Sequence, residues 1–315
     1  MVTKLFRLNK WNLKPFLFVL LALIVIGGIH PCEKLPITNP NLKLVVGDTT
    51  EDYDSLHCIY PVVSPDGKTI YYVGVNSDSV ADWGVEVGSI YSVTVDGTNN
   101  RKLADGLFDD LAISRDGGKL AVHPWSYRPP YYNPESLILI LNLPSLQIDT
   151  FPALGRKISG IEFDRGGERL YYVVFDWTPP ITSFYRLRLS DSTNEYLYSV
   201  KGYVGFDLFN DNSIYRDLDL ANPQINPVQE DYVIGGGGPV SGWSDVIRMR
   251  YLQSGNLECL PESLIPYDGR VGFFYWFPDG NTIVFSAQDY FGSGRYAPGE
   301  IWVLKNLFEQ IEEER

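Results

Sequence analysis

The 315-residue sequence has few of the residues that build metal and redox centres. It holds three histidines and three cysteines, and no Cys-x-x-Cys pair occurs. His30 belongs to the apolar N-terminal run, and His57 and His123 are scattered. Because zinc and redox sites need several such ligands at short spacing, we expect neither kind of site and no cofactor. Cys58 and Cys259 fall in different repeats, so we expect two buried small side chains rather than a disulfide.

Clustered positive charge is missing as well. The formal net charge is −13, from 26 basic and 39 acidic residues, and no cluster of Lys and Arg lies beyond residue 14. Nucleic-acid binding requires such clusters, because basic side chains displace the counterions of the phosphates. We therefore expect no nucleic-acid partner. The glycine run Gly235–Gly238 lacks the lysine and the strand-to-helix context of a phosphate-binding loop.

The N-terminus has the features of an export signal. Four basic residues precede a charge-free run, Pro15–Ile29. This length suits either the core of a signal peptide or a short membrane anchor, and the basic flank stays in the cytoplasm. We expect residues 1–30 to be that signal or anchor and residues 31–41 to be a linker. The remainder is then exported to the periplasm or the cell surface.

The sequence from Ile29 to Cys32, IHPC, resembles a bacterial lipobox, which would place a lipid on Cys32. His30 and Pro31 depart from the small residues expected at these places, so a lipoprotein is the less favoured outcome. An uncleaved anchor and ordinary signal cleavage stay open. In each case the protein reaches the membrane only through this segment.

The segment Ser64–Gly74, SPDGKTIYYVG, recurs along the chain as a polar turn followed by an alternating apolar strand. Asp-Gly and Asn-Gly turns reverse the chain through positive φ at little steric cost, and β-branched and aromatic residues favour the strand. Most copies are about 50 residues apart, which is typical of propellers and solenoids. The strands begin at Ile70, Leu120, Leu170, Ile214 and Ile283.

Each repeat continues with a second hairpin. It therefore supplies four short antiparallel strands, as one propeller blade does. The sequence predicts an all-β fold with a single propeller over residues 42–306. We expect five blades, with Leu220–Ser244 as an insertion in blade four, and six blades if that insertion holds a degenerate blade. The second hairpins span Ser89–Leu103, Leu137–Phe151, Phe184–Tyr198 and Val246–Leu260.

The last repeat is one strand short. After Gly299–Asn306 only an acidic tail, residues 307–315, remains. We expect Asn41–Asp48 to supply the missing outer strand and to close the ring by pairing the two ends of the propeller. Apolar residues of the tail recur at helical spacing, so the tail can form a short helix against the last blade.

The turn motifs resemble those of a known family, the TolB-type β-propellers with Pro-Asp, WD40-like repeats. The resemblance covers nearly all of residues 42–305. It implies an extracytoplasmic propeller that serves as a scaffold for protein contacts. The motifs are Ser64–Gly67, Ser114–Gly117, Phe277–Gly280 and, in eroded form, Asp164–Gly167 and Asn210–Asn212.

Similar propellers also cover the active site of prolyl-oligopeptidase-type peptidases. That use needs an α/β-hydrolase domain with a Gly-x-Ser-x-Gly elbow. The sequence has no such pentapeptide, and Gly242–Val246 lacks the closing glycine. We exclude this use. The resemblance leaves the function open, because the Asp-Gly turn is a structural element.

Carboxylates of the predicted inner strands are the candidate catalytic groups. When the repeats are aligned, the residues two positions before each turn form a column, and in this column Glu162 and Asp207 lie at equal depth in neighbouring blades. Asp110 lies two residues before Ala112, the residue of the second repeat in the same column. Two carboxyl groups about 5–9 Å apart supply the acid and the base or nucleophile for glycosidic cleavage. The alternatives are a solvated channel lining and a ring that binds a cation or another ligand. The column is Val62, Ala112, Glu162, Asp207 and Tyr275.

Aromatic loops between the second and third strands of the blades form a candidate binding rim. Stiff loops of Tyr, Trp and Pro favour recognition of a protein or a sugar, and packing of the loops on themselves is the alternative. The rim candidates are Trp125, Tyr127, Tyr131, Trp177, Tyr290 and Tyr296.

Asp48, Asp52 and Asp54 offer oxygen ligands for Ca²⁺. The segment lacks the ordered spacing and the central glycine of a known calcium loop, so a solvated connection is the alternative.

These patterns together predict a non-catalytic extracytoplasmic propeller that binds a protein or a glycan through its aromatic rim. A glycan-active enzyme that uses Glu162 and Asp207 is the alternative, and a scaffold with its partner on another face is a third. The sequence leaves the oligomeric state open.

Overall fold

Antiparallel strands make up nearly all of the regular structure in the described part of the chain. The exceptions there are a 3-10 turn, η1 (Glu262–Leu264), and one helix, α3 (Leu307–Glu313). The computed structural model describes residues 39–47, 56–75, 88–124, 127–128, 131–132, 136–155, 158–237, 243–266, 269–291, 295–296 and 299–313.

The strands form successive antiparallel sheets, most of them four strands wide, which is the arrangement of propeller blades. The long strand β5 belongs to two sheets, because its first half pairs with β4 and its second half with β6. The first sheet is β2 (His57–Val63), β3 (Thr69–Val75), β4 (Gly88–Thr94) and β5 (Arg101–Ile113). The second adds β6 (Lys119–Pro124), β9 (Ser136–Asn142) and β10 (Gln147–Ala153) to β5. The third is β11 (Ile158–Phe163), β12 (Arg169–Trp177), β13 (Pro180–Arg188) and β14 (Thr193–Lys201).

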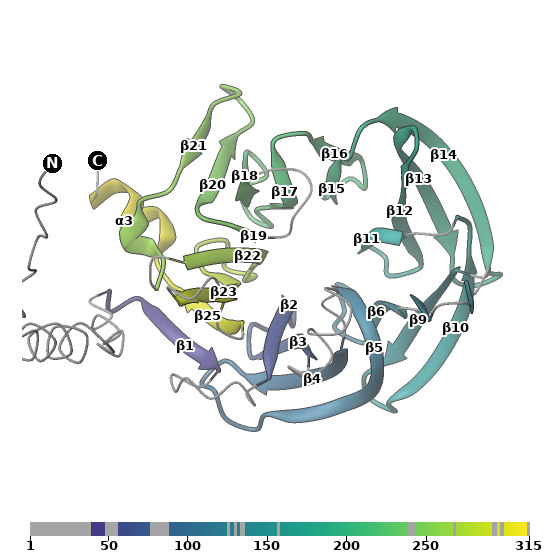
Figure 1. Cartoon of the computed structure of the whole chain (residues 1–315), viewed down its shortest axis with the longest axis horizontal. Coiled ribbons are helices and arrows are strands. Elements are labelled where there is room, and N and C mark those ends of the chain that lie inside the picture. Colours follow the sequence, from purple (N-terminus) through teal and green to yellow (C-terminus); the bar gives the residue numbers. More distant parts are fainter. Residues whose placement is uncertain are drawn as a thin grey trace, which may run out of the picture. The chain divides into compact units, whose positions relative to one another are not determined.

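The sheets that follow differ in width. A hairpin of two strands, β15 (Gly205–Leu208) and β16 (Ile214–Asp217), precedes a four-stranded sheet and the last sheet. Figure 1 shows the sheets arranged around a common centre, with β2, β11, β15, β17 and β22 nearest to it. The four-stranded sheet is β17 (Leu220–Ile225), β18 (Tyr232–Gly237), β20 (Ile247–Tyr251) and β21 (Leu257–Cys259). The last sheet is β22 (Gly269–Trp276), β23 (Ile283–Phe291), β25 (Glu300–Leu304) and β1 (Leu42–Val46).

Four further strands of two residues each lie at the margins of the sheets. Strands β7 (Tyr127–Arg128) and β8 (Tyr131–Tyr132) pair with each other between β6 and β9. Strand β19 (Trp243–Ser244) pairs with β22, and β24 (Arg295–Tyr296) pairs with β23.

The repeated turn is held by its own side chains. The Ser64 hydroxyl donates to Asp66 over 2.6 Å, and the same carboxylate accepts the Lys68 N–H over 3.1 Å. Gly67 has a φ of 70°, a conformation that costs glycine little. Ser114 and Asp116 repeat the 2.6 Å bond in the next copy. The Asp-Gly motif is therefore structural, as its sequence predicts.

The predicted insertion Leu220–Ser244 is wrong. This segment contains β17, β18 and β19, and β17 and β18 form a sheet with β20 and β21. Its turn is equivalent to the repeated one: Asn226 N–H donates to the Tyr232 carbonyl over 2.8 Å, as Ser64 N–H does to Thr69 over 2.8 Å. Asn226 is fully buried, and its side chain accepts bonds from the N–H groups of Val228 and Gln229. The sequence hid this copy because Asn-Pro replaces Ser-Pro and no Asp-Gly follows.

Apolar clusters fill the space between successive sheets. One of them joins the first sheet to the last, through Cys58, Val63 and Tyr72 on one side and Phe277 and Val284 on the other. Others join the first sheet to the second, the second to the third, and so on along the chain. Each sheet is therefore packed face to face against both of its neighbours.

The N-terminal strand completes the last sheet, as the sequence predicts. Strand β1 pairs antiparallel with β25, with Leu42 opposite Leu304 and Leu44 opposite Trp302. The acidic tail forms α3, also as expected. Its Leu307 and Ile311 are buried in the cluster of the last two sheets, and Phe308 stacks on Trp276 with ring centroids 6.1 Å apart.

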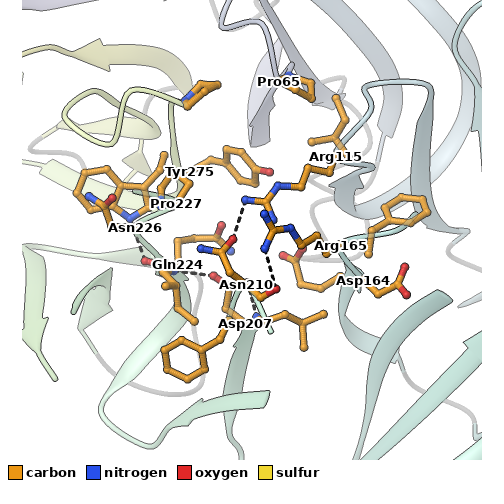
Figure 2. Close-up of a pocket in the computed structure, with 18 of the residues that line it drawn as sticks. Pro65, Arg115, Asp164, Arg165, Asp207, Asn210, Gln224, Asn226, Pro227 and Tyr275 are labelled. Atoms are coloured by element: carbon orange, nitrogen blue, oxygen red, sulfur yellow. Dashed lines mark hydrogen bonds between the residues drawn. The ribbon is translucent and has the colours of Figure 1, made fainter. Parts of the chain in front are cut away.

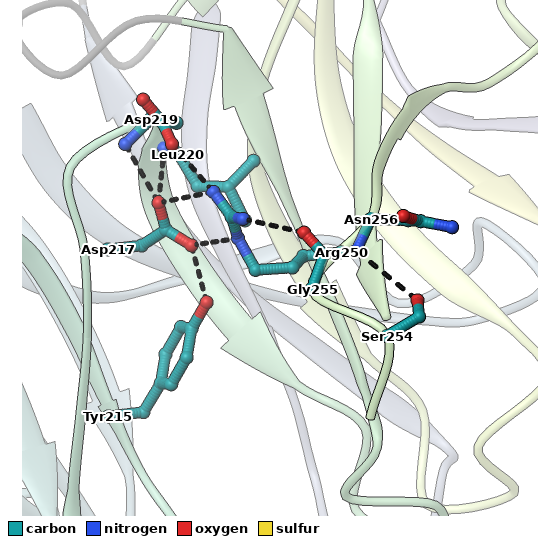
Figure 3. A network of polar contacts seen from close by, with 8 residues as sticks. All are labelled: Tyr215, Asp217, Asp219, Leu220, Arg250, Ser254, Gly255 and Asn256. Atoms are coloured by element: carbon teal, nitrogen blue, oxygen red, sulfur yellow. Dashed lines mark hydrogen bonds and ion pairs between the residues drawn. The ribbon is translucent and has the colours of Figure 1, made fainter. Parts of the chain in front are cut away.

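An ion-pair network ties the β15–β16 hairpin to the next sheet (Figure 3). Arg250 of β20 donates from Nε to Asp217 over 2.6 Å and from Nη2 to Asp219 over 2.7 Å. The Tyr215 hydroxyl also donates to Asp217, whose side chain is 3% exposed. The backbone N–H groups of Asp219 and Leu220 complete the set of donors.

The expectation for the cysteines is confirmed in part, and the expectation for the N-terminal segment stays a prediction. Cys58 and Cys259 form no disulfide, Cys58 is buried as expected, and Cys259 is exposed, so the expectation of a buried Cys259 is wrong. None of the helices in the described residues is long and apolar enough to cross a membrane. The apolar run Pro15–Ile29 and Cys32 lie outside the described residues.

Candidate functional site

Five inner strands, β2, β5, β11, β17 and β22, share a distortion just before the depth of the predicted column. Each of the five carries a β-bulge there, which bends the strand and re-aims the following side chain, whereas β15, which carries Asp207, pairs with β16 in regular register. Asp110, Asn222 and Phe273 have positive φ at these places. The bulges lie between Ile59 and Val62, Asp109 and Leu111, Ile158 and Gly160, Ala221 and Gln224, and Gly272 and Tyr275.

Three residues of the predicted column, Glu162, Asp207 and Tyr275, line a cavity of about 390 Å³, whereas Val62 and Ala112 do not. Figure 2 shows side chains of this cavity pointing inward from separate strands. Its deeper part, the floor, is formed by Glu162, Asp207, Gln224 and Tyr275. All four are half-buried, because they lie inside the protein and still face the cavity. The structure thus brings together the two predicted catalytic candidates, Glu162 and Asp207.

Burial and mutual repulsion control the charge of the two carboxyl groups. Burial raises the pKa of Glu162 well above its usual range, and the nearby charges of Asp207 and Asp110 raise it further. Burial also raises the pKa of Asp207 to about 7, against the opposing effect of two backbone donors. These are the N–H groups of Leu208 and Ile225, each 2.6 Å from an Asp207 oxygen. At neutral pH the pair therefore retains a proton.

Hydrogen bonds orient the rest of the floor. The Gln224 side chain lowers the pKa of Glu162 against the effect of burial, and the Gln224 backbone carbonyl accepts the indole N–H of Trp276 over 3.0 Å. Burial raises the pKa of Tyr275, and the charges of Glu162 and Asp207 add to that effect. Tyr275 therefore stays protonated and can donate its hydroxyl hydrogen into the cavity.

Two arginines stand at the mouth of the cavity, which we define as Arg115, Arg165 and Asn210. Arg115 donates to the Asn210 side chain over 2.6 Å, and Arg165 donates to the Asn210 carbonyl over 3.4 Å. Both arginines are exposed, and both occupy the second position of the repeated turn. Within the described residues, neither forms an ion pair with a carboxylate.

Asp110 lies in a neighbouring cavity of about 50 Å³ that shares Glu162 with the first. Burial, and then the charge of Asp109, raise the pKa of Asp110 to about 7. Burial raises the pKa of Tyr203 to about 12, with a contribution from Asp110. Asp110 and Glu162 therefore line the same smaller cavity, and Glu162 also lines the larger one.

His123 pairs with Asp109 beside this smaller cavity. The ring Nδ1 lies 2.6 Å from an Asp109 oxygen, and both side chains are largely buried. Burial lowers the pKa of His123, but the charge of Asp109 and its hydrogen bond outweigh burial, so the pKa is raised above 6.5. The pair fixes the end of β6, from which the β7–β8 hairpin follows.

The site offers proton donors and acceptors that converge on one cavity from separate strands. Among the described residues no group of three or more His, Cys, Asp and Glu side chains could hold a metal ion. Asp48, Asp52 and Asp54 lie outside the described residues, so the calcium site stays a prediction.

The rim candidates are placed by their strands. Trp177 is the last residue of β12 and pairs with Pro180 of β13. In the β23–β24 pair, the backbone of Tyr290 lies opposite that of Tyr296. Tyr127 and Tyr131 lie in β7 and β8. All of these stand between the second and third strands of their sheets, while Trp125 lies outside the described residues. Binding by the rim stays a prediction.

Sequence reasoning missed four residues of this cavity. Gln224 was hidden with its strand in the supposed insertion, although Asn226-Pro227 two residues later is the signal that locates it. Arg115 and Arg165 stand at one position of the aligned turns, which could have marked them. Nothing in the pattern distinguishes Asn210.

Comparisons with known proteins find similarity only to solved structures, at the level of the strand arrangement. No protein-family model matches the sequence, and no curated protein sequence matches it. Solved structures with a similar strand arrangement include a TolB and a β-propeller domain. The chain is similar to TolB of Acinetobacter baumannii, with 14% identity and a TM-score of 0.40 over 79% of this chain and 54% of that one. It is similar to the β-propeller domain of the Trilobed protease from Pyrococcus furiosus, with 12% identity and a TM-score of 0.47 over 78% and 84% of the two chains.

A third similar structure is the acylaminoacyl peptidase of Pyrococcus horikoshii, with 12% identity and a TM-score of 0.46 over 75% of this chain and 44% of that one. The chain therefore spans about half the length of this peptidase and of the Acinetobacter TolB. Similarities of this size carry no argument about activity, substrate or partner.

Proposed function

We propose that this chain is a non-catalytic, ligand-binding β-propeller whose ligand occupies the central cavity. The cavity of about 390 Å³ carries the proposal. Its volume suits a small molecule or the end of a larger one, and a few polar groups converge in it from separate strands. Carboxyl groups on its floor and guanidinium groups at its mouth give it both hydrogen-bond acceptors and donors.

We further propose that the propeller has six blades, the fourth reduced to the β15–β16 hairpin. The sheet β17–β21 and its Asn226 turn support the additional blade. The two strands of a hairpin run in opposite directions, so a blade that lacks its outer hairpin still leaves the chain running in the same direction. The inner strand of the next blade can therefore keep its usual direction. The apolar cluster between the first and last sheets supports closure of the ring.

The ligand-binding proposal is tested with the purified full chain by a thermal-shift screen of sugars, amino acids and short peptides. A ligand at a hundredfold excess over its Kd stabilises the fold by about 2.7 kcal/mol, which raises Tm by roughly 5 °C. Glu162→Gln and Arg165→Gln should reduce that shift, and Arg188→Gln, a residue that does not line the cavity, should keep it. A screen in which no compound shifts Tm overturns the proposal.

Glycosidic cleavage is the second candidate function. Glu162 and Asp207 line one cavity, and each affects the ionisation of the other, as an acid and its partner do in glycoside hydrolases. Hydrolysis of aryl glycosides or glycans that is lost in Glu162→Gln and in Asp207→Asn would support it. Absence of hydrolysis by the folded wild-type protein rejects it.

We also propose that the propeller works outside the cytoplasm and that the aromatic rim is a separate contact surface for a protein or a glycan. The basic flank and apolar run of residues 1–30 support export. The strand positions of Tyr127, Tyr131, Trp177 and Tyr290 support a common rim.

A further inference from the structure

The central cavity is lined by charged groups of both signs, and besides the residues of the mouth and the floor they include the carboxylates of Asp164 and Glu230. Arg115 and Arg165 stand at the mouth, and Glu162 and Asp207 lie on the floor. Figure 2 shows both guanidinium groups directed toward Asn210, over the side of the cavity where Asp207 lies. A ligand that fills the cavity therefore meets cationic and anionic groups at its two ends.

The two guanidinium groups are available to an anion. In the part of the chain that the structure describes, the guanidinium groups donate to the side-chain and backbone oxygens of Asn210, and both of these acceptors are neutral. An Arg pair with only neutral acceptors binds a carboxylate strongly, because the bonds to a carboxylate are charge-assisted and fit the planar guanidinium group.

Neither carboxyl group of the floor forms an ion pair with a cation among the described residues. The bonds that Asp207 accepts come from backbone N–H groups, and the side chain that lowers the pKa of Glu162 is the neutral amide of Gln224. Two partly buried carboxyl groups without a cation repel each other when both are ionised. A ligand ammonium group placed between them would remove that repulsion and donate up to three hydrogen bonds.

Apolar side chains line the wall between the two ends. Phe163, Leu208 and Ile225 follow the column residues of their strands and border the same cavity. They offer a surface to an aliphatic or aromatic side chain and none to a second charged group. A polyphosphate does not fit this environment, because its charges would approach the floor carboxylates and a protein of net charge −13.

We propose that the cavity binds a zwitterion of the amino-acid class, either a free amino acid or a dipeptide with apolar side chains. Its carboxylate bonds Arg115 and Arg165, and its ammonium group lies between Glu162 and Asp207. The inference rests on the proposed function, because it names the chemistry of the ligand in the same cavity.

Proton release provides a test independent of affinity. An ammonium group next to the pair favours the ionised carboxylates, so binding near pH 7 expels a proton into the buffer. The other titratable or charged groups around the pair are Asp110 and Tyr275, from neighbouring strands, and the side chains of Arg115, Asp164, Arg165 and Glu230, which line the same cavity.

The experiment is titration calorimetry of the full chain with leucyl-leucine, its N-acetyl form and its amide, in two buffers of different ionisation enthalpy at pH 7. We expect the dipeptide to bind at least tenfold more tightly than either blocked form and to release about one proton. Loss of the ammonium group in the N-acetyl form should abolish the proton release. Free leucine is titrated in the same way.

Variants separate the two ends of the cavity. Arg115→Gln with Arg165→Gln should weaken the dipeptide at least tenfold and leave the amide unchanged. Glu162→Gln should weaken both and abolish the proton release, and Arg188→Gln should change nothing. Equal affinities for the dipeptide and its blocked forms, or binding of neutral sugars alone, overturn the zwitterion inference and leave the proposed function standing. No binding by any class of compound overturns both.

Discussion

Arg115 and Asn210 lie 95 positions apart in the sequence, and Arg115 Nη2 donates to Asn210 Oδ1 over 2.6 Å. Arg115 follows β5 and Asn210 follows β15. The bond therefore joins turns from two repeats, and the repeat that begins with β11 lies between them in the sequence. Arg165, which follows β11, donates to the carbonyl of the same Asn210. Three successive sheets are therefore linked at the mouth of the cavity by one asparagine.

The turn that was hidden in the supposed insertion should be a strong contributor to stability. In Asn226→Ala the N–H groups of Val228 and Gln229 and the carbonyl of Gly280 lose their buried partner. We expect a loss of about 3 kcal/mol in the free energy of unfolding, measured with urea. Asn256→Ala, at an exposed turn, should change it by less than about 0.5 kcal/mol. Equal effects of the two substitutions would show that this turn has no structural role.

The link between the β15–β16 hairpin and β20 should behave as a buried ion pair. Asp217→Asn leaves Arg250, 19% exposed, without its main partner, and we expect a loss of about 3 kcal/mol in unfolding free energy. The matched control is Asp105→Asn, which breaks the exposed pair with Lys102 and should cause no measurable loss. Unfolding curves that coincide for the two variants would contradict a supporting role for the network.

Glu162 should reduce the stability of the protein as pH rises. Its raised pKa means that the folded protein keeps a proton that the unfolded chain has released. The stability it provides is complete below its usual pKa of 4.5 and is lost as pH rises through the raised value. We expect the Tm of Glu162→Gln to exceed that of the wild type by an amount that grows from pH 5 to pH 8.

The control for this pH series is Glu312→Gln, an exposed carboxyl of α3. Its Tm difference from the wild type should be the same at every pH. A constant difference for Glu162→Gln as well would mean that Glu162 titrates normally.

His123 should titrate above the usual value of 6.5, because Asp109 stabilises its charged form. The stability from this pair is complete below pH 6.5 and is lost as pH rises through the raised pKa. The imidazole resonances followed by NMR between pH 5 and pH 9 measure the midpoint. In Asp109→Asn burial acts with less opposition, so the midpoint should fall. An unchanged midpoint would remove Asp109 as the cause.

The aromatic rim is tested by crosslinking in the envelope of the exporting cell, with capture of the full chain and mass spectrometry. We expect a partner that is retained by the wild type and lost when Trp125, Tyr127, Trp177 and Tyr290 are changed to Ala in a chain that still folds. Replacement of the exposed Tyr196 on β14, outside the rim, is the control. A partner captured equally by all three places the contact elsewhere.

Much of the fold is predictable because its signal is local. The turns at Ser64 and Ser114 close on their own side chains, and each reports its position directly in the sequence. The same register placed Glu162 and Asp207 at one depth, which the cavity agrees with. The turn at Asn226 also closes on its own side chain, which accepts the N–H groups of Val228 and Gln229, but it has Asn-Pro in place of Ser-Pro and no Asp-Gly, so the local pattern did not reveal it.

The mouth of the cavity could not be predicted from spacing. Arg115, Arg165 and Asn210 come from different repeats, and their meeting depends on how the sheets pack around the centre. The ionisation of Glu162 likewise depends on burial and on Asp207, and neither is a property of the local sequence.

The pairing of β1 with β25 also determines how the protein responds to mechanical load. Leu42, the first residue of β1, lies opposite Leu304, the last residue of β25. Tension on the chain that precedes Leu42 would act on that end of the pair and peel the strands apart one hydrogen bond at a time. We therefore expect β1 to be the first strand of the last sheet to detach when the N-terminal segment is pulled.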